Sequence, residues 1–379
     1  MEPYIFLGIG VLLFFAKLFG EVSRRIGVSS LVGEVVAGIF VAMLGIVSIG
    51  PFISELAGLG IILILFLAGL MIKFEDIEKQ IYTASALAIG GDFLSFLLVF
   101  AASMLLTGSF LVSLVIGIIF ISTDNGAMMR MLEARGMLKT KIGKMIVATS
   151  IADDVVSILS LSFFMMYIVL SNVVASEIVK LFFISIGFYL FIFTFGSRIA
   201  NIALKALPKF LMDEYIFVSL PLAIALLVSI FSDNLGLGTA AGAFLAGMIV
   251  SKSRFAETVI APKIEVIGNG FLIPLFFAYI GTVVLLSEIN ILAVAVLLAA
   301  ALAGKYVGSG ILSRAFGFNN EESRIVGIGL MPRGDYSIII SQISISLGVI
   351  TVGIYSSIIL AVILTILITP VLMKISVRT

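Results

Sequence analysis

Residues 142–170 read IGKMIVATSIADDVVSILSLSFFMMYIVL. An apolar run of this length is long enough to cross a lipid bilayer as a helix. Asp153 and Asp154 stand side by side near its middle. An Asp at the centre of a membrane helix costs about 2.5–3.5 kcal/mol, so an acid at this depth is a candidate functional residue. Two such acids, able to exchange a proton for a cation, indicate an ion-coupled carrier.

The composition of the whole chain agrees with a membrane location. Of its 379 residues, 61% are hydrophobic and 12% are charged, and the mean hydropathy is +1.28. Soluble domains carry about 25% charged residues, so the sequence predicts an all-α, multi-pass membrane protein. The net charge of +1 argues against a nucleic-acid partner. The absence of Cys and His excludes disulfides, thiolate metal sites and a histidine pH switch.

Apolar runs separated by short polar turns predict thirteen membrane helices. We expect them at residues 4–19, 30–46, 55–72, 81–106, 110–134, 142–170, 177–205, 213–231, 238–251, 264–286, 291–314, 322–347 and 351–375. With Lys305 and Arg333 set aside as intramembrane, every Lys and Arg except Lys180 then falls on one side of the membrane. The positive-inside rule places the N-terminus outside and the C-terminus in the cytoplasm.

The predicted helices divide into two inverted halves of six, with the seventh helix, 177–205, as a linker. Helix 5 is interrupted by STDNG at 122–126, and helix 12 by PRGD at 332–335. Matched breaks of this kind mark midplane binding sites in transporters built from inverted repeats. We therefore expect a core, made by helices within 81–170 and 291–375, that holds both breaks. The remaining helices, within 4–72 and 213–286, form a scaffold that joins two copies in a homodimer.

Several polar residues inside the predicted spans are candidates for the site. A buried Lys needs an acid, so Lys305 is expected to pair with Asp153. Asp153 and Asp154 point about 100° apart on a helix, so they need not have the same role. Ser150, one turn before Asp154, and Thr123, in the first break, are candidate hydroxyl ligands of a cation. For Ser150 the alternative is a hydroxyl that is hydrogen-bonded back to its own helix.

The two breaks also carry charged residues. Ends of half-helices leave partial charges, which Asp124 at the first break and Arg333 at the second can compensate. Asp335 could pair with Arg333 or Lys305. Asp92, in helix 4, could neutralise the core or ligate an ion, and the sequence leaves both open.

Two further acids lie nearer the cytoplasmic ends of their helices. For Glu34 and Glu265 we favour a solvated funnel wall over an ion ligand.

The chain resembles the cation/proton antiporter superfamily, in particular the NapA-type sodium/proton exchangers and their Kef-type relatives. The matching segments are SLVGEVVAGIF, STDNGAMMRMLEARGML, IGKMIVATSIADDVVSIL and IGLMPRGDYSIII, together with Lys305. The resemblance implies that Asp154 binds cation and proton alternately and that Asp153 pairs with Lys305. It also implies a core that slides against the scaffold, in the plasma (inner) membrane of a prokaryote. Asp335 departs from the family pattern, because Kef-type relatives usually carry Glu there.

The leading hypothesis is therefore an electrogenic Na⁺(Li⁺)/H⁺ antiporter, with no enzymatic activity and no cofactor. Potassium/proton exchange is the alternative, and a cation channel is a weaker one, because a channel needs a continuous pore with several weak sites. The intact pair of acids favours sodium. Kef-type proteins usually continue into a nucleotide-binding domain, and the absence of one before Thr379 points the same way.

Overall fold

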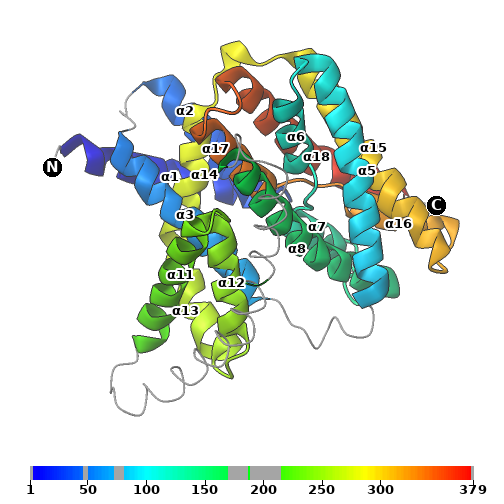
Figure 1. Cartoon of the computed structure of the whole chain (residues 1–379), viewed down its shortest axis with the longest axis horizontal. Coiled ribbons are helices and arrows are strands. Elements are labelled where there is room, and N and C mark those ends of the chain that lie inside the picture. Colours follow the sequence, from blue (N-terminus) through cyan, green and yellow to red (C-terminus); the bar gives the residue numbers. More distant parts are fainter. Residues whose placement is uncertain (1–2, 46–49, 72–80, 170–186, 188–214, 377–379) are drawn as a thin grey trace. The chain divides into compact units, whose positions relative to one another are not determined.

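The computed structural model describes residues 3–45, 50–71, 81–169, 187 and 215–376, and within these ranges the regular structure is helical with no strand (Figure 1). The helices are α1 (Pro3–Arg25), α2 (Ser30–Leu44), α3 (Pro51–Leu70), α5 (Ile81–Thr107), α6 (Phe110–Ile119), α7 (Asn125–Ala134), α8 (Lys141–Val169), α11 (Ile216–Asn234), α12 (Thr239–Ser251), α13 (Ala261–Ile267), α14 (Ile273–Val283), α15 (Ile291–Ala315), α16 (Asn320–Gly329), α17 (Asp335–Ser346) and α18 (Val352–Ser376). The sequence thus predicts the helical class correctly.

Many of these helices are long and apolar enough to cross a membrane. Among the described residues eight helical stretches meet that condition, and α2, α6 and α12 are shorter apolar helices. The predicted seventh helix, 177–205, lies outside the described residues. The chain is therefore a multi-pass membrane protein, while the count of thirteen helices stays a prediction.

One predicted span has different limits in the structure. The sequence predicts a helix at 264–286, whereas the helical stretch begins at Ala256 and ends at Val283. It contains two π-helical turns, Ala256–Ile260 and Gly268–Leu272, on either side of α13. The start is predicted too late because Glu257, Pro262 and Lys263 interrupt the apolar run from which the span is predicted.

Both predicted helix breaks are present. The chain is not helical between the end of α6 at Ile119 and the start of α7 at Asn125, nor between the end of α16 at Gly329 and the start of α17 at Asp335. The two non-helical segments are in contact: the Asp124 amide donates a hydrogen bond to the Pro332 carbonyl (2.7 Å). Backbone groups freed by each break are therefore satisfied in part by the other break.

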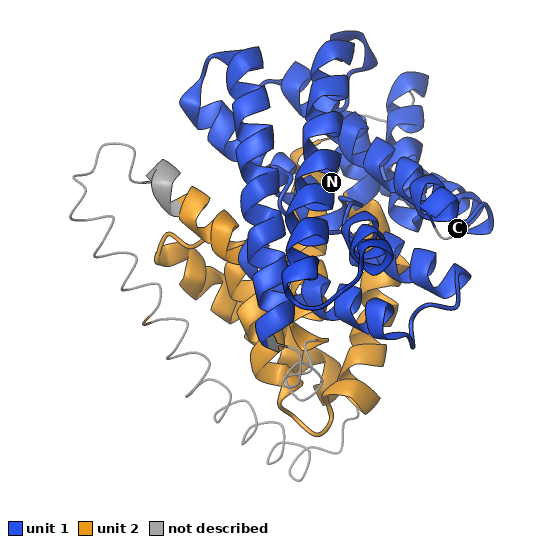
Figure 2. Cartoon of the chain, turned by 90° about the vertical axis from the view of Figure 1, so that its right-hand side faces the viewer, with its two compact units in different colours: residues 1–48, 76–157, 277–379 blue, residues 49–75, 158–276 orange. Residues whose placement is uncertain are grey.

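The chain divides into two compact units (Figure 2): residues 1–48, 76–157 and 277–379 form the first, and residues 49–75 and 158–276 form the second. In the first unit α5 packs along α15, α1 packs on α2, and α17 contacts α6 and α18. In the second unit α12 packs on α3 and α11. The first unit thus holds most of the predicted core together with α1, α2 and the end of α14, while residues 158–169 of α8 belong to the second unit. The division into a moving core and a scaffold concerns function and remains a proposal.

Each unit has its own apolar core. In the first unit buried Met, Leu and Ile side chains of α7, α8 and α16 form one cluster, which includes Met128, Ile146 and Val326. In the second unit Phe66, Ala246 and Ile264 belong to another.

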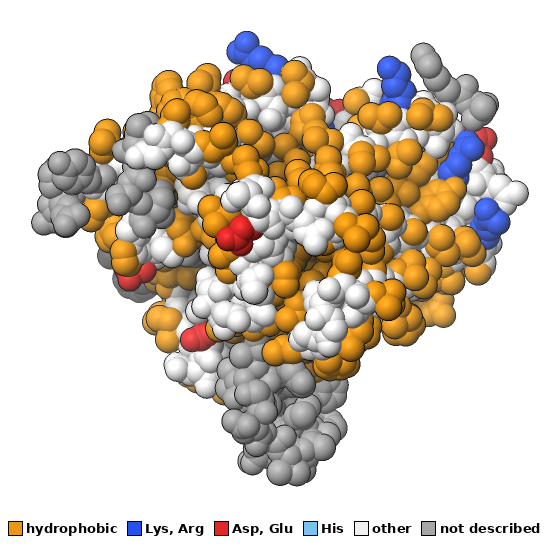
Figure 3. Space-filling view, turned by 90° about the horizontal axis from the view of Figure 1, so that it is seen from above, with side chains coloured by type: hydrophobic (Ala, Val, Ile, Leu, Met, Phe, Trp, Pro, Cys, Tyr) orange, Lys and Arg blue, Asp and Glu red, His pale blue; other side chains and the backbone are white. Residues whose placement is uncertain are grey.

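Large apolar side chains also lie on the surface. Phe14 on α1 is 63% exposed and Phe231 on α11 is 62% exposed. Hydrophobic side chains dominate the described surface on the face drawn in Figure 3, with few charged side chains among them. A surface of this composition is suited to contact with lipid rather than water.

Candidate functional site

The site is built in the first unit on the close packing of α5 against α15. A Cβ at Gly304 would collide with the backbone of Ser95, and one at Gly308 would contact the backbone of Gly91. Only glycine allows these helix backbones to approach so closely. The Ser309 hydroxyl on α15 donates a hydrogen bond to the Leu87 carbonyl on α5 (3.1 Å). The two helices thereby bring Asp92 and Lys305 face to face.

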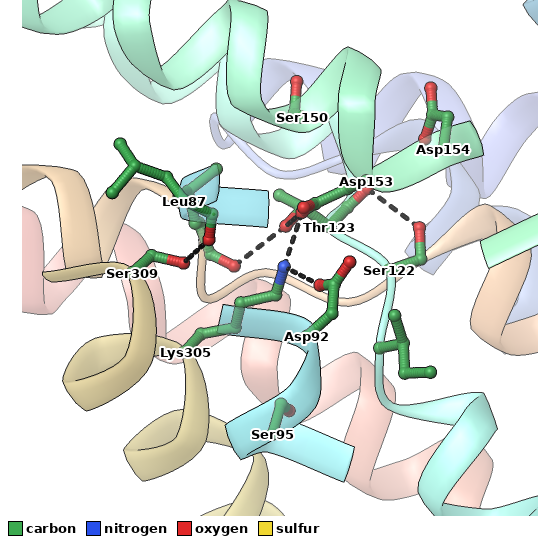
Figure 4. Close-up of polar contacts among 12 residues, drawn as sticks. Leu87, Asp92, Ser95, Ser122, Thr123, Ser150, Asp153, Asp154, Lys305 and Ser309 are labelled. Atoms are coloured by element: carbon green, nitrogen blue, oxygen red, sulfur yellow. Dashed lines mark hydrogen bonds and ion pairs between the residues drawn. The ribbon is translucent and has the colours of Figure 1, made fainter. Parts of the chain in front are cut away.

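Lys305 contacts two carboxylates at once (Figure 4). Its Nζ atom lies 2.5 Å from Asp92 Oδ1 and 2.5 Å from Asp153 Oδ2. The side chains of Lys305 and Asp153 are fully buried, and that of Asp92 is 3% exposed. The contact expected between Lys305 and Asp153 is present, and Asp92 joins it as a second acid. Charges at this depth are stable only when they are paired in this way.

Thr123 supports the Asp153 side of this cluster. Its hydroxyl donates a hydrogen bond to Asp153 Oδ2 (2.6 Å), and the Leu330 carbonyl lies 3.0 Å from the same hydroxyl oxygen. Thr123 therefore connects the first break, the second break and α8. The structure places it against Asp153, whereas the sequence suggests it as a cation ligand beside Asp154.

Asp124 fits the first break as an N-cap. Its Oδ1 accepts a hydrogen bond from the Ala127 amide (2.6 Å) at the start of α7. Its Oδ2 packs against Gly334 in the second break, where a Cβ would collide with the carboxylate. An acid at a helix N-terminus meets both the free amides and the positive end of the helix dipole.

Arg333 compensates the opposite end of a half-helix. Its side chain is fully buried, and Nη1 donates to the carbonyls of Ile121 (2.8 Å) and Ser122 (3.1 Å), which follow the end of α6. Nη2 donates to the Ser95 hydroxyl (2.9 Å) and to the Ala301 carbonyl (3.2 Å). The guanidinium thus binds carbonyl groups that the break leaves without helical partners.

Asp154 faces away from the Lys305 cluster, while Asp153 points into it (Figure 4). Asp154 Oδ2 accepts a hydrogen bond from Asn125 Nδ2 (2.7 Å). Asp154 Oδ1 and Asn125 Oδ1 are both buried and have no hydrogen-bond partner among the described residues. Carboxylate and amide oxygens are the type of ligand that a hard cation prefers. No three carboxylates converge as in a metal centre within the described part of the chain.

The Ser150 hydroxyl is already hydrogen-bonded within its own helix. Its hydroxyl donates to the Val147 carbonyl of the same helix (3.0 Å), which is the alternative that the sequence leaves open. This arrangement keeps the lone pairs of the oxygen available but ties its proton to the backbone.

Asp335 pairs with neither of the cations that the sequence suggests. In the described part of the structure no ion pair joins it to Arg333 or Lys305. The charged groups that act on it are Asp124, Glu34 and Arg130. The expectation is wrong because the Arg333 side chain extends toward α6 and Lys305 is already held by two acids.

The two acids nearer the helix ends differ from each other. Glu34 is 6% exposed and lies in the first unit, where the charges of Lys17, Arg24 and Arg130 act on it. A solvated wall is therefore the wrong description for Glu34. Glu265 lies in the second unit and is partly exposed.

Sequence reasoning missed two residues of this site. The sequence places Asn125 in the first break but does not predict that its amide contacts Asp154. Ser95 is absent from the predicted site, although it lies three residues after Asp92, which puts both on one face of α5. That spacing is the signal that could have identified Ser95.

Known proteins that are similar to this chain are ion antiporters. Residues 10–376 match the family model described as "Sodium/hydrogen exchanger, transmembrane". A relative from Bacillus cereus, the Na(+)/H(+)-K(+) antiporter GerN, is 27% identical over 99% of this chain and 96% of its own. A Na(+)/H(+) antiporter of Enterococcus hirae is 27% identical over 97% of each chain.

A solved structure shares the fold. The sodium proton antiporter MjNhaP1 from Methanocaldococcus jannaschii superposes over 99% of both chains with a TM-score of 0.75, at 16% sequence identity. The relatives are transporters rather than enzymes, and the ions are substrates rather than cofactors. The chain belongs to the transmembrane sodium/hydrogen exchanger family and is a cation/proton antiporter.

Proposed function

We propose that this antiporter exchanges Na⁺, or Li⁺, for H⁺ and that both ions compete for Asp154. The observation that carries the proposal is the pair of buried oxygens, Asp154 Oδ1 and Asn125 Oδ1, without hydrogen-bond partners among the described residues. A carboxylate can hold either a proton or a hard cation, and oxygen ligands suit Na⁺. Competition at one site is sufficient for antiport, since either bound ion permits the return step.

Ser150, one turn before Asp154, and Thr123, in the first break, are weaker candidates for further ligands. The Ser150 hydroxyl is bonded to its own helix, and the Thr123 hydroxyl is bonded to Asp153. Asp124 and Arg333 hold the crossing in shape through their bonds to backbone groups.

Transport follows an alternating-access scheme in this proposal. The core made by helices within 81–170 and 291–375 slides against the scaffold made by helices within 4–72 and 213–286, and the scaffold joins two copies. The N-terminus lies outside and the C-terminus in the cytoplasm of a prokaryotic plasma membrane. The distribution of Lys and Arg and the location of the intramembrane charges support this arrangement.

The proposed exchange is electrogenic, with two protons for each Na⁺. One proton comes from Asp154 and the other from the cluster around Lys305. A net charge moved across the membrane is worth about 2.3 kcal/mol per 100 mV, so an inside-negative potential drives Na⁺ outward even without a pH gradient. Electroneutral exchange is the alternative. For the ion, K⁺ is the alternative, since the name of the Bacillus cereus relative includes K⁺.

Ion flux in proteoliposomes tests the proposal. Vesicles are prepared with a set pH gradient, and Na⁺, Li⁺ and K⁺ are offered separately. In buffers that contain Na⁺ and no K⁺, an imposed voltage should change the Na⁺ flux. Coupled flux with K⁺ alone would show that the exchanged cation is potassium rather than sodium. Uncoupled flux of each ion would indicate a channel. A Na⁺ flux that does not change with voltage would show one-for-one exchange instead of the two-proton scheme.

A further inference from the structure

A cavity of about 120 Å³ lies in the first unit, between the turn that joins α1 to α2, the helix α7 and the second half of α18. Ser29, Met131 and Ile366 line it and are buried, whereas Gly27 and Ala134 line it and are exposed, so the cavity opens to the surface. None of the proposed ligands of the transported ion is among the described residues that line it. The cavity is therefore separate from the proposed ion site, and its own side chains determine what it can bind.

Both charged side chains in the described lining of the cavity are arginines. Arg130 lies on α7, and Arg135 directly follows that helix. Within the described part of the chain no ion pair joins the Arg135 guanidinium to an acid. The charge of Arg130 acts on three acids, Glu34, Asp124 and Asp335, but none of these acids lines the cavity. Arg135 is therefore the less compensated of the two cations.

Arg130 has hydrogen-bond donors that its contacts within the protein do not use. Its Nε atom donates to the Gly126 carbonyl (3.2 Å). Nη1 donates to the Val28 carbonyl (3.3 Å), and Nη2 donates to the Ser29 hydroxyl (3.0 Å). A guanidinium carries five N–H groups, so one N–H remains on each of Nη1 and Nη2. Ser29 accepts from Arg130 and makes no side-chain bond to cap α2, so its own proton is also available to donate.

From these donors we propose that the cavity binds a terminal phosphate group, held by Arg130, Arg135 and Ser29. Arginine suits phosphate because its N–H groups can pair with two phosphate oxygens at once. The cavity volume is about four times the roughly 30 Å³ that one water molecule occupies in the liquid, which leaves room for the four oxygens of a phosphate. In the proposed topology the cavity faces the cytoplasm, so the phosphate comes either from the headgroup of an anionic lipid or from solution. Basic pockets between membrane helices on this side bind anionic headgroups.

A bound phosphate would connect parts of the first unit that are separate in sequence. Arg130 and Arg135 belong to α7 and its C-terminal end, and Ser29 belongs to the turn before α2. A ligand that binds all three in the folded protein stabilises that state by mass action. The proposal does not depend on which ion is exchanged, so phosphate binding and the proposed Na⁺/H⁺ exchange succeed or fail separately.

Thermal unfolding of the purified full-length protein tests the proposal. It is followed in detergent by circular dichroism, since the chain has no Trp. The lipid probe is short-chain phosphatidic acid, which carries a terminal phosphate, and the control lipid is phosphatidylcholine of the same chain length. We expect phosphatidic acid, and not phosphatidylcholine, to raise the unfolding temperature of the wild type. R135Q should raise the half-saturating concentration of phosphatidic acid at least about tenfold, because it loses a charge-assisted contact.

R314Q is the matched control, because Arg314 is exposed in the last turn of α15 and does not line the cavity. It should respond to phosphatidic acid like the wild type. A134E keeps both arginines and places a carboxylate at the exposed mouth of the cavity, so it should weaken binding as R135Q does. This second variant keeps the test available if R135Q does not fold. A response to phosphatidic acid that is unchanged in R135Q or in A134E overturns the proposal.

Inorganic phosphate, titrated at constant ionic strength, distinguishes the two sources of the ligand. A rise in the unfolding temperature with inorganic phosphate that R135Q removes identifies phosphate from solution as a ligand. A rise with phosphatidic acid alone, again removed by R135Q, identifies the lipid headgroup. If neither probe raises the unfolding temperature of the wild type, the cavity is not a phosphate site.

Discussion

Asp153 and Asp154 are neighbours in sequence, yet the two faces of α8 that carry them are organised differently. Asp153 lies in a cluster where Lys305 and Arg333 offset its charge and Thr123 supplies a hydrogen bond. Asp154 meets the Asn125 amide, and the nearby charges that act on it are those of other acids, Asp153, Asp335 and Asp124.

This difference in charge compensation indicates which of the two acids can exchange a proton for a cation. An acid whose charge is already compensated gains little from a cation, whereas an uncompensated carboxylate in a buried site gains much. We therefore propose that the compensated face maintains the structure where the breaks meet and that the uncompensated face binds the transported ion.

The largest effect is expected from D154N. The substitution keeps the shape of the side chain but removes the charge and the exchangeable proton, so Na⁺/H⁺ exchange should fall below about one tenth of the wild-type rate, equivalent to more than about 1.4 kcal/mol. The rate is measured as Na⁺-driven proton flux in proteoliposomes.

D233N is the matched control, since Asp233 is exposed near the end of α11. It should transport like the wild type. Near wild-type exchange in D154N would show that the uncompensated face is not the ion site and would break the comparison between the two acids.

An intermediate effect is expected from N125A. Alanine removes both the hydrogen bond to Asp154 and the Oδ1 atom proposed as a ligand, and the loss of one such interaction costs about 0.5–1.5 kcal/mol. The Na⁺ concentration for half-maximal flux should therefore rise about twofold to tenfold, with less effect on the maximal rate.

N234A is the control for N125A, because Asn234 is exposed at the end of α11. An unchanged half-maximal Na⁺ concentration in N125A would show that Asn125 is not a ligand of the ion. Asp154 would then bind the ion together with other oxygen atoms.

The smallest effect is expected from S150A. The Ser150 hydroxyl is bonded to the Val147 carbonyl of its own helix, so its removal should change the half-maximal Na⁺ concentration by less than about twofold, or roughly 0.4 kcal/mol. The same flux assay measures it. A rise as large as that in N125A would instead identify Ser150 as a ligand and sharpen the description of the Asp154 face.

The local features of this protein can be predicted from its amino-acid sequence alone. Long apolar runs predict the helices because the bilayer sets their length. The motifs around Ser122–Gly126 and Pro332–Asp335 predict the two breaks, and the depth of Asp153, Asp154 and Lys305 identifies them as candidates for the site. These features depend on composition and spacing within one segment, so they can be read without knowing how segments meet.

Which charged side chains meet depends on how the helices pack in three dimensions. Lys305 contacts Asp92, 213 positions earlier, as well as the predicted Asp153. Arg333 extends to the carbonyls after α6 instead of Asp335, and Asn125 contacts Asp154. Such partners are set by where helices cross and how closely glycines let them approach. Spacing along the chain places a residue on a face of its own helix, but it does not say which helix lies opposite that face.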